Sequence, residues 1–227
     1  MTTTTLERAV RASSNPNAKG MRTKQQILDA AEQCFAEKGF EGVSMRLVAD
    51  RAAVLLGLLT YHFATKESLF AAVIARRADE LNANRLAAMT LVAPDDLVGL
   101  LEAFIHPYLD LLETGEPGWR AYAHVIAVTA QDSRWSALGE QYFGAVGRMF
   151  ISRLQVAVSG LDEDLAVRAY VHTVSIIMGL FAASGLIDRF SGGRLDSNDL
   201  RCGYAPALRF LAGGIRSLAD ASARPTD

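Results

Sequence analysis

The sequence has few of the residues that cross-link or bend a chain. Its 227 residues include 2 cysteines and 6 prolines. Cys34 and Cys202 lie far apart and neither belongs to a metal-type C-x-x-C pair, so we interpret both as reduced thiols in a helical interior. Scarce proline and long Ala- and Leu-rich stretches favour an all-α fold, and a hydrophobic content of 50% is enough for a substantial core.

Targeting and membrane signals are also missing. The N-terminal segment MTTTTLERAVRASSNPNAKG has no apolar core, so it is not a signal peptide. Ala169 to Ile187 has no Asp, Glu, Lys or Arg and is nearly long enough to span a bilayer. It contains Tyr170, His172 and Ser175 and has no aromatic belt or basic flank, so we interpret it as a buried helix. A cytoplasmic protein without a membrane partner is therefore expected.

Patterns that carry catalysis are absent from the sequence. It has no H-E-x-x-H motif, no P-loop, no dinucleotide-binding glycine pattern and no nucleophile elbow. The histidines at 62, 106, 124 and 172 do not share metal-ligand spacing. We expect no enzyme, no catalytic residues, no cofactor and no metal.

Charge is unevenly distributed along the chain. The net charge is −2, but residues 1–66 hold 9 Lys or Arg against 6 Asp or Glu, whereas residues 67–227 hold 14 against 19. A basic front joined to an acidic body suits a protein whose first part meets phosphate groups.

The N-terminal third has the pattern of a compact helical unit. Residues 1–20 are polar and are predicted to form a flexible arm. Thr23 to Lys38 is an amphipathic helix that Gly39 ends. Ser44 can cap a short helix over residues 45–52, and a tight link at Ala53 and Val54 precedes a second short helix over 56–62. Two short helices braced by a longer one is the arrangement of helix-turn-helix DNA-binding units.

The segment GFEGVSMRLVADRAAVLLGLLTYHFATKESLF resembles the helix-turn-helix of the TetR (tetracycline-repressor) family of bacterial regulators. The resemblance runs from about Thr23 to Phe70. It implies an all-α protein of about nine helices, with a helix-turn-helix domain over residues 21–68 and an effector-binding and dimerisation domain over residues 69–227. It further implies a homodimer that binds a palindromic double-stranded DNA operator, and the usual mode of the family is repression relieved by a small effector.

The resemblance places the DNA-contacting residues on the two short helices and the start of the next. Phosphate contacts position such a domain, and side chains at the groove choose bases. The predicted DNA-binding residues are Arg46, Leu56, Gly57, Leu58, Thr60, Tyr61, His62 and Lys66.

Three positions depart from the family pattern. Ala53 stands where a glycine usually makes the turn, which costs about 1 kcal/mol if the residue is left-handed. Leu55 stands where Ser or Thr usually caps the recognition helix, which loses about 1 kcal/mol. Leu47 replaces the acid of the capping box. The alternative interpretation is therefore a ligand-binding protein of this family in which DNA binding is weakened or lost.

The rest of the chain is predicted to be helical, with a long helix from about residue 163 to Phe190 and a last helix over residues 197–219. Aromatic and imidazole groups concentrate in its middle and predict an apolar effector cavity with a few polar points. Tyr108, His124 and Phe150 belong to this concentration, and the predicted effector-binding residues are His106, Trp119, Tyr122, Trp135, Tyr142 and Phe143. A weaker resemblance of LNANRLAAM, LLEAFIHPYLDLL and WRAYAHVIAVTAQD to a fatty-acyl-responsive TetR subgroup implies a fatty acyl effector.

The last two long helices are the predicted dimer face. A helix that is apolar nearly all round must be covered on two sides. Small residues allow close contact there, and the final helix supplies aliphatic side chains. The predicted dimer-interface residues are Gly179, Ala182, Ala183, Leu208, Leu211 and Ile215.

Overall fold

The computed structural model describes residues 16–222, and over this range the chain is helical and has no strand. The predicted all-α fold is confirmed, with ten α-helices and one 3₁₀ turn among the described residues in place of about nine. The elements are α1 Pro16–Lys38, α2 Met45–Arg51, α3 Leu56–His62, α4 Lys66–Thr90, α5 Leu97–Thr114, α6 Gly118–Thr129, η1 Ser133–Trp135, α7 Ser136–Ala157, α8 Glu163–Phe181, α9 Leu186–Phe190 and α10 Leu200–Ser222.

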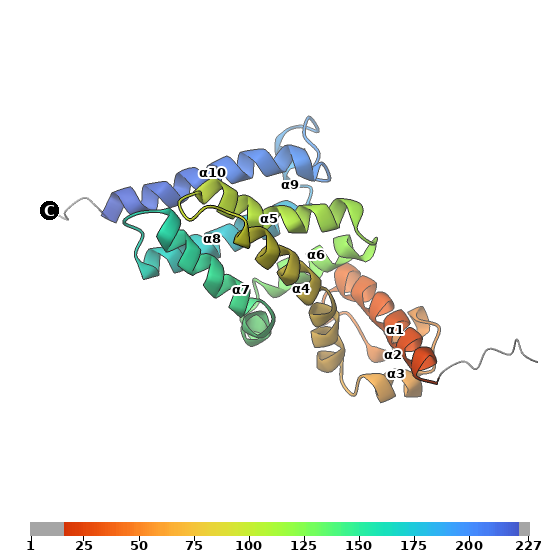
Figure 1. Ribbon diagram of the computed structural model, residues 1–227. Coiled ribbons are helices and arrows are strands. Elements are labelled where there is room, and N and C mark those ends of the chain that lie inside the picture. Colours follow the sequence, from red (N-terminus) through yellow and green to blue (C-terminus); the bar gives the residue numbers. More distant parts are fainter. Residues whose placement is uncertain (1–15, 223–227) are drawn as a thin grey trace, which may run out of the picture.

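Helices α1, α2 and α3 form a small bundle, called here the N-terminal bundle, at one end of the molecule (Figure 1). Its core follows from the amphipathic face of α1, on which Ile27, Ala31 and Cys34 are completely buried. Gly39 ends α1 in the left-handed conformation, with φ 65°, as predicted for a residue after a helix C-terminus. Leu59 of α3 reaches the same core.

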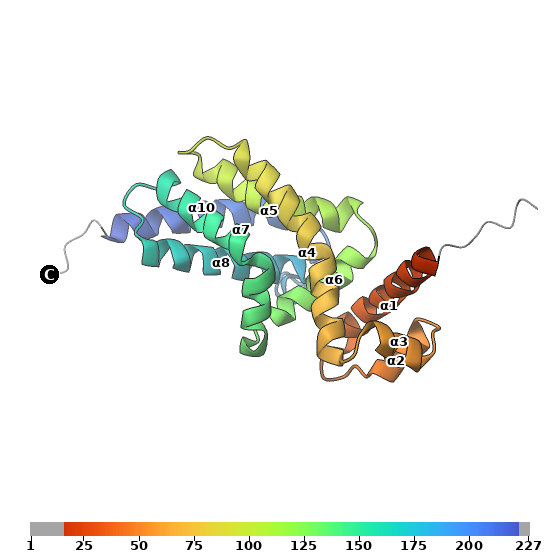
Figure 2. The ribbon, with the colours of Figure 1, turned by 60° about the horizontal axis from the view of Figure 1, so that its bottom comes forward.

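Helices α4 to α10 form the larger part of the molecule, called here the body (Figure 2). Helix α4 leaves the N-terminal bundle and packs against α5 and α7, while α8 packs against α6, α7 and α10. The bundle meets the body where α1 packs against α4 and α6. Because α4 runs unbroken through residues 66–90, it connects the two parts directly.

The first helix begins earlier than predicted. Residues 1–15 of the predicted flexible arm lie outside the described residues, but residues 16–20 belong to α1. Pro16 is the first residue of α1, where its fixed φ suits a helix and its missing N–H removes no intrahelical hydrogen bond. Proline therefore starts this helix and does not mark the end of an arm.

The predicted helix from about residue 163 to Phe190 is two helices. Helix α8 ends at Phe181, and α9 starts at Leu186. Between them Ala183 has φ 47° and Gly185 has φ 75°, and two left-handed residues within three positions cannot continue a right-handed helix. Among the helices of residues 16–222, α8 is the one long and apolar enough to cross a membrane, but its inner face packs against three other helices of the body.

Candidate DNA interface and effector cavity

The turn between α2 and α3 has the strain that the sequence predicts. Ala53 adopts φ 51°, a left-handed conformation that a residue with a Cβ atom pays for. The Val54 N–H then donates to the Ala49 carbonyl at 3.0 Å, which closes the end of α2. At the other end of α2, the Leu47 N–H donates to the Ser44 Oγ at 3.1 Å, so the predicted cap of α2 is present.

Helix α3 has no such cap. Leu55 occupies its N-cap position in an extended conformation and makes no side-chain hydrogen bond. Its side chain is 82% exposed, so it is not held by packing in this chain either. The first N–H groups of α3 therefore rely on solvent or on an external acceptor.

The outer face of α3 is open and largely apolar. Leu56 and Leu58 are exposed, and Tyr61 is 82% exposed. A Cβ atom at Gly57 would meet no other atom within 4 Å, so nothing inside the chain requires a glycine there. The Thr60 hydroxyl lies 3.1 Å from the Leu56 carbonyl, to which it can donate, and this leaves mainly its methyl group for outside contacts. This face suits close approach by a partner surface and apolar contact with it.

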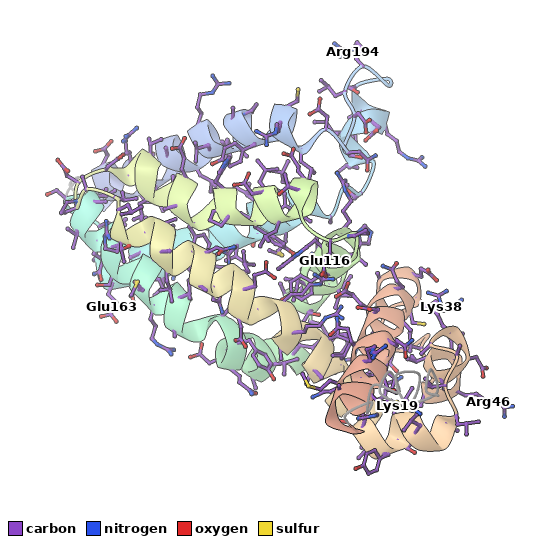
Figure 3. The ribbon with its side chains drawn as sticks, turned by 45° about the vertical axis from the view of Figure 1, so that its right-hand side comes forward. Lys19, Lys38, Arg46, Glu116, Glu163 and Arg194 are labelled. Carbon is purple, nitrogen blue, oxygen red and sulfur yellow. The ribbon has the colours of Figure 1, made fainter. Side chains whose placement is uncertain are left out.

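The predicted basic contacts differ in how free they are. Arg46 is exposed at the outer edge of the N-terminal bundle (Figure 3) and has no ion pair within residues 16–222. Lys66 instead donates from Nζ to the Phe40 carbonyl at 2.9 Å and lies 4.3 Å from the centroid of the Phe40 ring. His62 is half-buried between neighbouring rings. Arg46 is thus the cation best placed for a phosphate, whereas Lys66 mainly ties α4 to the end of α1.

The body contains a partly open cavity of about 330 Å³ between α4, α5, α6, η1, α7 and α8. Of the predicted effector-binding residues, Tyr122, Trp135 and Phe143 line it. The other three candidates lie outside its wall. His106 is on the surface, 3.4 Å from Asp110, and Trp119 is buried against Arg77 and Tyr108. Tyr142 also lies outside the cavity wall, and its backbone carbonyl accepts a hydrogen bond from the Asn82 side chain.

The residue that sequence reasoning missed is Arg85. It lies on α4, is 5% exposed and lines the cavity. Its Nε donates to the Phe104 carbonyl at 2.8 Å. A usable signal was in the sequence, because Arg85 continues the three- and four-residue spacing of Ile74, Ala78 and Leu81, so a charged residue stands on the buried face of α4.

One wall of the cavity also touches the segment between α1 and α2 and the start of α4. The Trp135 ring lies 4.7 Å from the ring centroid of Phe40 and 4.6 Å from that of Phe70. Next to it, Arg134 pairs with Glu41 at 2.5 Å and with Asp132 at 2.7 Å. The hydrogen bonds from Arg134 lower the pKa of both carboxyl groups. A displacement of η1 would therefore disturb these contacts with the segment that leads into α2.

The predicted dimer residues divide into two sets. Leu208, Leu211 and Ile215 on α10 are buried within the single chain. Gly179 is exposed on α8, and Ala182 and Ala183 are half-buried at the break after it. The large apolar side chains that these two helices leave exposed include Val171 and Phe210.

Comparison with known proteins fits both parts of the fold. Residues 27–73 match the profile of the bacterial regulatory proteins of the tetR family, and residues 102–214 match the tetracyclin repressor-like C-terminal domain. The chain belongs to the TetR family. The first match covers the helix-turn-helix and the start of α4, and the second covers most of the body.

Curated TetR relatives match mainly at the N-terminal end. The HTH-type transcriptional repressor AcnR of Corynebacterium efficiens is 36% identical over 72 residues, which are 30% of this chain and 38% of AcnR. The HTH-type transcriptional activator FasR of Mycolicibacterium smegmatis is 32% identical over 95 residues, 42% of each protein. The chain thus spans about two fifths of the length of these curated relatives.

Solved structures resemble the TetR fold of this chain over nearly all of its length. The fatty acid degradation regulator FadR from Bacillus halodurans has a TM-score of 0.63 at 17% identity, covering 86% of this chain and 96% of FadR. Salmonella enterica GusR has a TM-score of 0.61 at 19% identity, covering 88% and 96%. At such low identities the likeness extends to the fold alone.

Proposed function

We propose that this protein is a DNA-binding transcriptional regulator that acts as a cytoplasmic homodimer. The observation that carries the proposal is the exposed outer face of α3, held by α1 and α2, beside Arg46, which has no ion pair within residues 16–222. In helix-turn-helix proteins the second helix enters the major groove and the first turn of the helix before it meets the backbone. Apolar side chains such as Leu56 and Leu58 would read thymine methyl groups.

The proposed dimer forms through α8 and α10. Val171 and Phe210 would supply apolar contact, and Gly179 would let the two α8 helices approach closely. Leu208, Leu211 and Ile215 would support this face from beneath. A two-fold dimer binds a palindromic operator whose two half-sites have centres about 34–36 Å apart.

The cavity is the proposed effector site, and repression relieved by the effector is the proposed mode of control. Trp135 is shared between the cavity wall and the aromatic contact with Phe40 and Phe70. An effector that displaces Trp135 would bind preferentially to the form in which the N-terminal bundle has moved. That difference in affinity sets how far DNA binding falls.

A mobility-shift assay on the DNA upstream of the protein's own gene, at stated salt, tests the regulator proposal. Arg46→Ala should weaken binding across sequences and reduce the salt dependence by roughly one counterion. Arg148→Ala is the matched control, because Arg148 is exposed on α7 in the body, where it pairs with Glu140. No shift by the wild-type protein at micromolar concentration would refute the proposal.

A ligand-binding protein with weakened DNA binding is the second candidate. The strained Ala53 and the uncapped Leu55 favour it, since both destabilise the helix that would read DNA. Specific TetR-type binding with nanomolar affinity at physiological salt would exclude this candidate, whereas binding that disappears between low and physiological salt would support it.

A further inference from the structure

Arg85 is a buried cation whose terminal amino groups have no partner. Its guanidinium lies 4.1 Å from the Phe104 ring centroid, and Nε is bound to the Phe104 carbonyl. Among residues 16–222 no carboxylate pairs with Arg85, and neither of its terminal amino groups donates a hydrogen bond. The residue lines the cavity, so these groups are placed to meet a ligand there.

The charges around Arg85 do not neutralise it. Burial lowers the pKa of Arg85 to about 10, which still leaves the side chain protonated at neutral pH. Burial raises the pKa of Tyr108, Tyr122 and Tyr170, so these neighbours stay uncharged. Asp132, the acidic residue in the cavity wall, is held by Arg134. Arg85 is therefore a positive charge in the cavity wall that no nearby carboxylate of the wall balances.

Tyr108 adds a second unsatisfied group to the same wall. Its hydroxyl is buried and has no hydrogen-bond partner within the described part of the chain. Its ring centroid lies 5.8 Å from the Arg85 guanidinium carbon. A buried charge without a counterion is costly to a protein, and buried polar groups without partners are rare. Their occurrence together in a cavity points to a ligand that completes them.

We infer that the cavity binds an apolar monocarboxylate whose head group pairs with Arg85. The two terminal amino groups of a guanidinium match the two oxygens of a carboxylate. A single cation balances a single negative charge, whereas a phosphate dianion would leave an excess negative charge in the cavity. The rest of the ligand would pack on aliphatic residues of the wall, among them Leu81, Ile126 and Ile177.

The cavity volume limits the size of the acid. A cavity of about 150 Å³ holds benzene, so 330 Å³ has room for roughly a dozen non-hydrogen atoms. Decanoate and 4-phenylbutyrate are acids of this size with different shapes. Their primary amides keep the size and shape but remove the charge, which makes them matched probes.

The inference deepens the proposed function, because it rests on the cavity being the effector site. Binding of both acids and both amides is measured by titration calorimetry on the full chain, wild-type and Arg85→Met. Arg148→Met, on the surface of α7, is the control variant. The wild type and the control should bind each acid roughly 10- to 100-fold more tightly than its amide, as expected for hydrogen bonds to a charged group.

In Arg85→Met this preference should disappear while amide binding persists, which also shows that the variant is folded and its cavity intact. Equal binding of acid and amide by the wild type, an unchanged preference in Arg85→Met, or no binding of any probe would each overturn the inference. Operator binding without ligand is measured on the same preparations. If the wild type shows no acid preference but still binds DNA, the inference alone is overturned, whereas absent DNA binding by the wild type would overturn the proposed function.

Discussion

Glu32→Gln should strongly destabilise the fold, because Glu32 is the centre of a buried ion cluster. Glu32 lies on α1 and is 1% exposed. It accepts from Arg76 at 2.6 Å and from Arg77 at 2.7 Å and 3.0 Å. Both arginines belong to α4, so the cluster joins the N-terminal bundle to the helix that leads into the body.

The magnitude follows from what the substitution leaves behind. Arg77 is 5% exposed, and without the Glu32 charge its nearest carboxylate is that of Glu116 at 3.6 Å, which is 77% exposed to solvent. Breaking a buried ion pair by removing one partner costs about 3–5 kcal/mol, because the other charge remains buried. A domain is stable by about 5–15 kcal/mol, so this loss is a large share of the total.

Urea unfolding followed by circular dichroism measures the effect, with Asp29→Asn as the matched control. Asp29 pairs with the same Arg76 at 2.5 Å, but its side chain is largely exposed. An exposed pair contributes about 0–1 kcal/mol, so Asp29→Asn should change stability little. If Glu32→Gln costs less than about 1 kcal/mol, or no more than Asp29→Asn, the reasoning about the buried charge is refuted.

Three further substitutions test the turn and the cavity wall. Leu55→Ser should raise the free energy of unfolding by about 1 kcal/mol because the serine caps α3, and it should also raise operator affinity. Leu55→Ala is the control. A more stable protein that binds DNA more weakly would instead identify Leu55 as a DNA contact. Ala53→Gly should raise the free energy of unfolding by up to about 1 kcal/mol, since φ 51° strains an alanine, and a decrease in thermal unfolding temperature would contradict this. Trp135→Leu should leave decanoate binding measurable but weaken the effect of decanoate on the mobility shift, because the ring contacts with Phe40 and Phe70 are lost. An unchanged effect of decanoate would exclude coupling through Trp135.

The helix-turn-helix could be predicted from the sequence because its signals are local. The Ser44 cap, the Gly39 stop and the apolar spacing of α1 act within a few residues of one another, so they predict where the helices begin and end. The left-handed Ala53 and the uncapped Leu55 were predictable for the same reason. The exception is the start of α1, because the sequence around Pro16 is equally compatible with a polar arm and with the first turn of a helix.

The cavity was decided only by the tertiary structure, because its wall comes from five helices. Which aromatic residues line it depends on how each helix is rotated. His106 and Tyr108 are two positions apart on α5, which turns them about 200° from one another, so one faces solvent and the other the cavity. Composition predicted that aromatic groups gather in this region, but it could not sort them.

The same limit applies to charge and to the dimer face. Leu208 and Leu211 have the spacing of an interface, but α10 packs on α5 and α8 and buries them within one chain. The sequence places Arg85 as a charge on an apolar helix face, but only the packing of α4 against α5 buries it. That packing also leaves Arg85 without a carboxylate partner among residues 16–222. Local sequence therefore determined the family and the helix-turn-helix, whereas helix packing determined which side chains line the cavity of the body.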